Sequence, residues 1–233
     1  NDLLSLTQPE AVKKIHRKFL EAGADIIETN TFSGTTIAMA DYDMEELVYE
    51  LNYESAKIAK QVAEEFTKKN PSKPRFVAGS IGPTNKTASM SPDVNDPGFR
   101  AISFDELRIA YKQQIEALLD GGADILLVET IFDTLNAKAA LFAIEEVKDE
   151  RNIEVPVMVS GTAEAFLISI SHIPILSVGF NCALGAKQLV PHLEVVSAKS
   201  EFAISAHPNA GLPNAFGEYD ETPAQMAAQI KEY

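Results

Sequence analysis

The chain has 233 residues, of which 45% are hydrophobic, and its formal net charge at pH 7 is −14. This much apolar sequence can form a full core, which excludes a disordered chain, and the negative charge argues against nucleic-acid binding because phosphates would be repelled. No apolar run approaches the roughly 18 residues of a spanning helix, so we expect no membrane contact. The single cysteine, Cys182, excludes an internal disulfide and favours a reducing, cytoplasmic compartment.

Three capping patterns mark predicted helix starts. Thr7-Gln8-Pro9-Glu10 predicts a first helix, capped by Thr7 and ending near Gly23. Ser103-Phe104-Asp105-Glu106 predicts the same kind of start for a later helix. Thr222-Pro223-Ala224-Gln225 opens the last predicted helix, with a proline at the first helical position.

Six short, continuously apolar runs predict buried parallel strands, because they lack the alternation of a half-exposed sheet. The runs are residues 25–28, 76–80, 124–128, 155–160, 175–180 and 202–206. Helical patterns between most of them indicate βαβ units in a single α/β domain over residues 1–233. Residues 163–174 leave little more than the ~10–12 residues that a crossover needs, so we expect some of the chain to be missing near Thr162.

Polar clusters follow the carboxyl ends of these runs. They are Glu28-Thr29-Asn30-Thr31, Gly82-Pro83-Thr84-Asn85, Glu129-Thr130, Ser160-Gly161-Thr162, Asn181-Cys182 and His207-Pro208-Asn209. A barrel collects its active site at the carboxyl ends of its strands, whereas a doubly wound sheet would show a glycine-rich phosphate loop, and the sequence has none. The pattern therefore predicts a TIM-type (β/α)8 barrel whose first and last strands lie outside residues 1–233.

Some of these polar residues admit two interpretations. Glu28 and Glu129 suit the acid and base of a lyase or hydrolase, and they suit equally well a role in fixing a loop amide or binding a substrate amine. The amides of Asn30, Asn85 and Asn181 either hold a polar ligand or satisfy the loop backbone, and for Asn85 we favour the structural role. The sequence leaves these alternatives open.

Cys182 is the most informative single residue. A lone cysteine is usually a small buried hydrophobe, but this one follows Asn181 at a strand end and directly precedes a predicted helix start. A thiolate there suits a nucleophile, with His207 as the candidate base, or a metal ligand. A zinc site would need about three protein ligands. The remaining histidines, interpreted as surface or packing residues, are His16, His172 and His192.

Five longer motifs follow one another along the chain. They are Glu28-Thr29-Asn30-Thr31-Phe32, Gly82-Pro83-Thr84-Asn85-Lys86-Thr87, Glu129-Thr130-Ile131-Phe132-Asp133, Asn181-Cys182-Ala183-Leu184-Gly185 and Pro208-Asn209-Ala210-Gly211-Leu212-Pro213. In this order they resemble the homocysteine-binding domain of cobalamin-dependent methionine synthase, over nearly the whole chain. The second motif and Tyr219-Asp220-Glu221-Thr222-Pro223 favour this enzyme over the betaine- and S-methylmethionine-dependent homocysteine methyltransferases, which remain the alternative.

The resemblance implies a zinc-dependent homocysteine S-methyltransferase domain on a (β/α)8 barrel. In the family, zinc held by three cysteines activates the homocysteine thiolate, which accepts the methyl group of methylcobalamin and becomes methionine. Methylcobalamin would be bound by another domain. The implied partners are homocysteine and the folate-, cobalamin- and reactivation-type domains of the same polypeptide.

By motif, Cys182 matches the first zinc ligand, and Glu129 and Thr130 match residues that hold the amino acid moiety of homocysteine. The further residues expected close to the site are Asn30, Thr31 and Asn209. The family's Gly-Gly-Cys-Cys-Gly segment, which carries the other two zinc ligands, is not in this sequence. We therefore expect residues 1–233 alone to bind zinc weakly and not to turn over. A module that binds a small amino acid without chemistry is a further interpretation.

Overall fold

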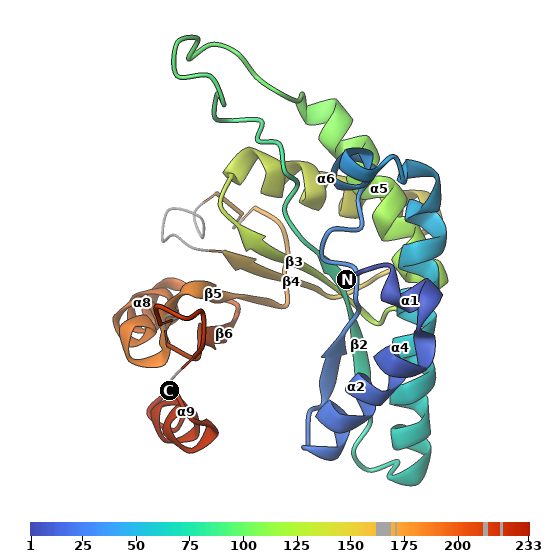
Figure 1. Ribbon diagram of the computed structural model, residues 1–233, viewed down its shortest axis with the longest axis vertical. Helices are drawn as coiled ribbons and strands as arrows, with labels where there is room; N and C mark the ends of the chain where they lie inside the picture. Colours follow the sequence, from blue (N-terminus) through green and yellow to red (C-terminus); the bar gives the residue numbers. More distant parts are fainter. Residues whose placement is uncertain (162–168, 171, 212–213, 220) are drawn as a thin grey trace. The chain divides into compact units, whose positions relative to one another are not determined.

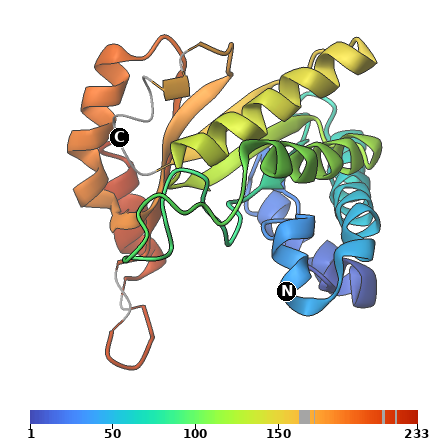
Figure 2. The same ribbon diagram turned by 90° about the horizontal axis from the view of Figure 1, so that it is seen from above.

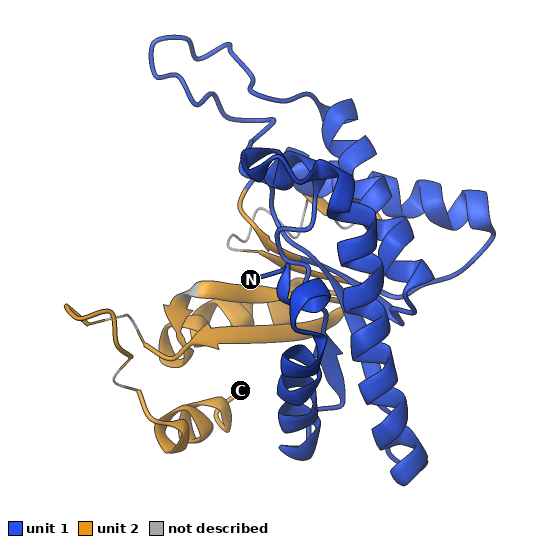
Figure 3. Ribbon diagram, turned by 45° about the vertical axis from the view of Figure 1, so that its right-hand side comes forward, with its two compact units in different colours: residues 1–128, 133–157 blue, residues 129–132, 158–233 orange. Residues whose placement is uncertain are grey.

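The computed structural model describes residues 1–161, 169–170, 172–211, 214–219 and 221–233 (Figure 1). The chain divides into two compact units, coloured separately in Figure 3. Unit 1 comprises Asn1–Val128 and Asp133–Val157, and unit 2 comprises Glu129–Phe132 and Met158–Tyr233. Both units are of the α/β type, with parallel strands. Among the described residues, no helix is long and apolar enough to span a membrane.

Unit 1 contains the strands β1 and β2 and most of β3, which pair in parallel in this order. Their bounds are Ile26–Glu28, Phe76–Ile81 and Ile125–Ile131, and the last residues of β3 belong to unit 2. The helices are α1 (Leu4–Thr7), α2 (Pro9–Glu21), α3 (Thr36–Met39), α4 (Val48–Lys69), α5 (Phe104–Asp120) and α6 (Thr134–Arg151), with the 3-10 turns η1 (Ala40–Tyr42) and η2 (Glu45–Leu47).

The core of unit 1 forms where alternate strand residues face the helices. Ile27 of β1 and Val77 of β2 are buried against Leu20 of α2 and Val62 of α4. Neighbouring positions on the strands point the other way, since Ile26 remains 40% exposed. Alternation of this kind follows from the period of two in a strand, and it means that helices cover one face of this part of the sheet.

Unit 2 is built on β4, β5 and β6, which also pair in parallel in this order. Their bounds are Val157–Gly161, Ser177–Gly185 and Ala203–Asn209, and the first residue of β4 belongs to unit 1. The helices are α8 (Ala186–Lys199) and α9 (Pro223–Ile230). Helix α8, orange in Figure 2, packs on β5 and β6, with His192 edge-on to Phe180. A Cβ at Gly179 would collide with the carbonyl oxygen of Ser205 on β6, so only glycine allows this close backbone approach.

All six predicted strands are confirmed, and the pairings β1–β2, β2–β3, β4–β5 and β5–β6 are all parallel. The capping boxes at Ser103 and Thr222 are confirmed as well. The cap at Thr7 is wrong: Thr7 ends the separate helix α1, and its hydroxyl donates to the carbonyl of Leu3, so Gln8 precedes α2 without a side-chain cap. The predicted crossover at residues 163–174 lies largely outside the described residues.

Candidate functional site

In unit 2, one carboxamide connects the carboxyl ends of three strands. Asn181 of β5 is only 6% exposed, and its Nδ2 donates to Oγ1 of Thr130 at 2.6 Å and to Sγ of Cys182 at 3.4 Å. Its Oδ1 accepts a hydrogen bond from Oγ of Ser160 on β4 at 2.9 Å. We call these four residues the Asn181 cluster. Both halves of the amide are occupied, so its orientation is defined by its partners.

Two members of the Asn181 cluster have an unusual backbone. Thr130 and Cys182 both adopt φ of 58°, in the left-handed region that side chains with a Cβ avoid. The other described non-glycine residues with positive φ, Asp43 and Asn152, end helical segments, where such residues are tolerated. Left-handed backbone at other residue types costs about 1–3 kcal/mol each and clusters at functional sites.

A bulge in β5 accounts for the direction of the Cys182 thiol. Asn181 pairs with His207 of β6, but the next pair is Gly185 with Asn209, so three residues of β5 stand against one of β6. The chain leaves the ladder at Cys182, whose side chain is exposed. The predicted helix start directly after Cys182 is wrong, because the bulge extends β5 to Gly185 and α8 begins only at Ala186. The first residue of α8 therefore follows Cys182 by four positions in the chain.

Three further predicted residues lie near strand ends of unit 2. Glu129, on β3 beside Thr130, is half-buried. Asn209 ends β6 and is half-buried, opposite Gly185 across the bulge. His207, considered as a base for Cys182, is exposed and faces Asn181 in the strand register. Their roles in binding remain predictions.

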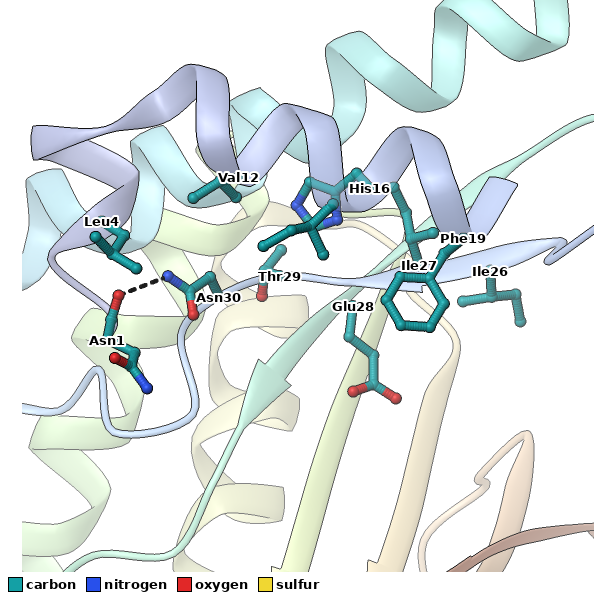
Figure 4. Close-up of a pocket in the computed structure, with 11 residues that line it drawn as sticks. Asn1, Leu4, Val12, His16, Phe19, Ile26, Ile27, Glu28, Thr29 and Asn30 are labelled. Atoms are coloured by element: carbon teal, nitrogen blue, oxygen red, sulfur yellow. Dashed lines mark hydrogen bonds between the residues drawn. The ribbon is translucent and has the colours of Figure 1, made fainter. Parts of the chain in front are cut away.

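The predicted residues of unit 1 have partners within that unit. Asn30 donates to the backbone carbonyl of Asn1 at 3.0 Å, which ties the first residues of the chain to the end of β1 (Figure 4). Thr31 is fully buried, and its hydroxyl donates to the carbonyl of Ser80 at 2.7 Å. These contacts hold strand ends together, and a substrate role for Asn30 and Thr31 remains a prediction.

Glu28 lies at a cavity of about 660 Å³ in unit 1, whose lining includes Phe19 and Ile26. Figure 4 shows its carboxylate pointing away from α2. The side chain reaches solvent, but desolvation by its surroundings raises the pKa of Glu28 above its ordinary value. A raised pKa suits a proton donor, yet Glu129, the other half of the predicted acid–base pair, belongs to unit 2.

The loop after β2 is fastened by two residues at the start of α6, a role that the sequence interpretation missed. Asn136 donates to the carbonyl of Lys86 at 2.9 Å, and Asp133 accepts from Oγ of Ser89 at 2.6 Å. Burial acts to raise the pKa of Asp133, but the hydrogen bonds that it accepts from Ser89, Leu135 and Asn136 together keep that pKa below its ordinary value. The sequence carries a signal for the role of Asp133, because an aspartate directly before a helical segment is a typical N-cap, and Asp133 caps α6.

Asn85, in the same loop, donates to Oδ2 of Asp41 at 2.6 Å. This contact agrees with the structural role favoured for it.

The described residues do not fit a three-cysteine zinc site. No three His, Cys, Asp or Glu side chains among them come together as metal ligands. Cys182 is the one cysteine of the sequence, so at most one thiolate of such a site is present.

Comparison with known proteins decides the family. The homocysteine S-methyltransferase family model matches residues 1–233. The chain belongs to this family. The chain is also similar to solved structures of the homocysteine methyltransferase MmuM from Escherichia coli. The metallated form has a TM-score of 0.75 at 22% identity, and the apo form 0.68 at 20%, each covering 100% of this chain and 89% of that one.

At these identities the structural likeness shows a shared fold. The family match indicates homocysteine methyl transfer and does not identify the methyl donor. The resemblance found in the motifs is thereby confirmed at the level of the homocysteine S-methyltransferase family. The sequence by itself leaves the role of Asn181 open. The structure shows that its amide joins Thr130 to Cys182.

Proposed function

We propose that this chain is the homocysteine-binding domain of a methyltransferase that forms methionine. The observation that carries the proposal is the Asn181 cluster, because it joins Thr130 and Cys182, whose motifs match a substrate-binding residue and a metal ligand of the family. In the reaction, the homocysteine thiol loses its proton and its sulfur forms a bond to the methyl carbon. The bond between that carbon and the donor breaks, and its electron pair stays with the donor.

The chain's own residues bind and orient the amino acid in this proposal. The Glu129 carboxylate complements the substrate's ammonium group, and the Thr130 hydroxyl donates to its carboxylate. Asn209, at the end of β6 in the same unit, is proposed as a further substrate contact, whereas a substrate role for Asn30 and Thr31 rests on their motif alone. Substrate positioning of this kind can supply a large share of a rate enhancement, because it replaces a bimolecular encounter by a fixed geometry.

The donor and the metal form the finer part of the proposal. We infer that methylcobalamin, bound by another domain of the same polypeptide, supplies the methyl group. Betaine and S-methylmethionine are equally consistent with the family match. Cys182 would supply one thiolate to zinc, and the other ligands would come from outside residues 1–233.

We also propose that residues 1–233 form one barrel domain of a larger multidomain, cytoplasmic enzyme, closed by strands outside these residues. The support comes from unit 1, where β1 has β2 as its one strand partner among the described residues. Next to that free edge, the apolar side chains of Phe19 and Ile26 remain exposed. Unpaired strand edges and exposed apolar residues are normally covered in a native protein.

The test is a methyl-transfer assay of the full-length protein, with homocysteine and each of the three donors in turn. We expect methionine with methylcobalamin, loss of activity with a zinc chelator, and unchanged activity in Glu28→Gln. Activity that survives both chelation and Cys182→Ala would favour the lyase or hydrolase alternative. Homocysteine binding without transfer from any donor would favour a binding module.

A further inference from the structure

We propose that Asn181 is a positioning residue that fixes the spacing between the Thr130 hydroxyl and the Cys182 thiol, and thereby the length of the amino acid thiol that the site accepts. The inference rests on the proposed function, because it assigns Thr130 to the amino acid end of the substrate and Cys182 to its sulfur end. Asn181 itself touches neither the substrate nor the methyl donor in this proposal. It acts through its two partners.

The hydrogen bonds of Asn181 leave its side chain no free orientation. Nδ2 has two hydrogens, and both have acceptors: Oγ1 of Thr130 and Sγ of Cys182. Rotating the amide by half a turn would break these bonds and the one that Oδ1 accepts from Ser160. Because the side chain is nearly fully buried, water cannot readily replace the lost partners, and the unpaired groups would destabilise the fold.

The backbone conformation of Thr130 and Cys182 needs contacts that hold it, and the Asn181 amide supplies one to each residue. Cys182 has left the β5 ladder at the bulge, and Asn181 is the one hydrogen-bond partner of its sulfur among the described residues. Thr130 holds the same left-handed φ as Cys182. Backbone in such sparsely populated regions persists only where surrounding contacts over-determine it. The shared donor Nδ2 supplies that contact to both residues at once.

A fixed spacing has a consequence for substrate choice. Homocysteine and cysteine carry the same ammonium, carboxylate and thiol groups and differ by one methylene. A site discriminates such a pair by about 10–200-fold, provided that the groups holding its two ends keep their distance. If the connection between Thr130 and Cys182 is cut, the two residues can adjust to the shorter molecule. Loss of Asn181 should therefore lower the preference for homocysteine.

The test compares variants of the full-length protein by calorimetry with homocysteine and with cysteine. Asn181→Asp keeps the size of the side chain but removes both N–H donors. We expect it to weaken homocysteine binding about ten-fold and to reduce the homocysteine preference at least five-fold. Hydrogen exchange should accelerate together in residues 129–132 and 180–186. A purely structural residue would lower the melting temperature without changing the preference.

Ser177→Ala is the matched control, since Ser177 is buried on the same strand and its hydroxyl has no partner among the described residues. It should leave binding, preference and exchange unchanged. If Asn181→Asp does not fold, Ser160→Ala gives the test, because it frees Oδ1 while Asn181 stays. Its effect should have the same direction and a smaller size.

The inference would be overturned if a folded Asn181→Asp kept the wild-type preference for homocysteine and the wild-type hydrogen exchange. If Asn181→Asp does not fold, the same result in Ser160→Ala would overturn it. A wild-type protein that binds neither amino acid would instead refute the proposed function. In that case the exchange of residues 129–132 and 180–186 still decides whether Asn181 holds both partners.

Discussion

Strand ends in the two units use their polar side chains differently. In unit 1, the hydroxyls of Thr29 and Thr31 share a hydrogen bond and both reach the backbone of the next strand: Thr31 donates to the carbonyl of Ser80, and Thr29 accepts from the Ser80 amide. In unit 2, Thr130, Asn181 and Cys182 bond to one another through their side chains. The first arrangement extends the sheet, whereas the second holds polar groups in place around a strained backbone.

This difference supports the proposed placement of the site in unit 2. A side chain that satisfies a neighbouring backbone group contributes to stability, and its loss leaves a buried partner unpaired. Thr130 and Cys182, whose side chains bond to Asn181, both have left-handed φ, and strained backbone of this kind is typical of functional positions. Similar clusters of threonine and asparagine in the sequence therefore have different consequences when they are mutated.

The largest effect should follow from Cys182→Ser. We expect methyl transfer by the full-length protein to fall by more than about 100-fold, because in the proposed function a hydroxyl would replace a thiolate ligand. Mutating even the residues that bond to a metal ligand typically lowers activity by about 10–100-fold. The melting temperature should hardly change, since the Cys182 side chain is exposed. Retained activity in the steady-state assay would mean that unit 2 does not contain the site.

A second test probes unit 1 by pH. Burial lowers the pKa of His16 from 6.5 to about 4, and its Nε2 has no partner among the described residues. Above pH 6.5 the ring is neutral in both folded and unfolded chains. As the pH falls toward 4, the unfolded chain takes up the proton first, so about 3 kcal/mol of the free energy of unfolding should be lost across this window.

Denaturant titrations between pH 7 and 4 measure this loss. In His16→Leu, the free energy of unfolding should depend less on pH than in the wild type. His172→Gln, at an exposed position, should keep the wild-type dependence. Equal slopes for wild type and His16→Leu would show that His16 is accessible to protons in the folded protein.

The smallest effects should come from paired threonine variants. Thr31→Val should cost about 1–2 kcal/mol of stability, because the hydroxyl bound to Ser80 is fully buried, and should leave the homocysteine Kd unchanged. Thr130→Val should raise that Kd several-fold with less loss of stability. Melting curves and calorimetry on the same samples compare the two. The reverse outcome would favour the substrate role predicted for Thr31.

Much of the fold was predictable from local pattern. The six strands follow from runs of apolar residues, and the capping boxes at Ser103 and Thr222 follow from residues three positions apart. The cap at Thr7 failed because a short preceding helix competes for the same hydroxyl. Local signals are reliable when one segment uses a residue and fail when two segments compete for it.

Sequence was enough to assign the family, the parallel strands and the polar clusters at their ends, because hydrophobic periodicity, caps and ordered motifs are properties of neighbouring residues. The roles within those clusters depend on partners far along the chain: Thr130 and Asn181 are 51 positions apart, and Thr31 and Ser80 are 49. Local spacing carries no information about such pairings. They arise when parallel strands pack in register, and that packing gives the Thr31 hydroxyl a backbone partner and the Thr130 hydroxyl a side-chain partner.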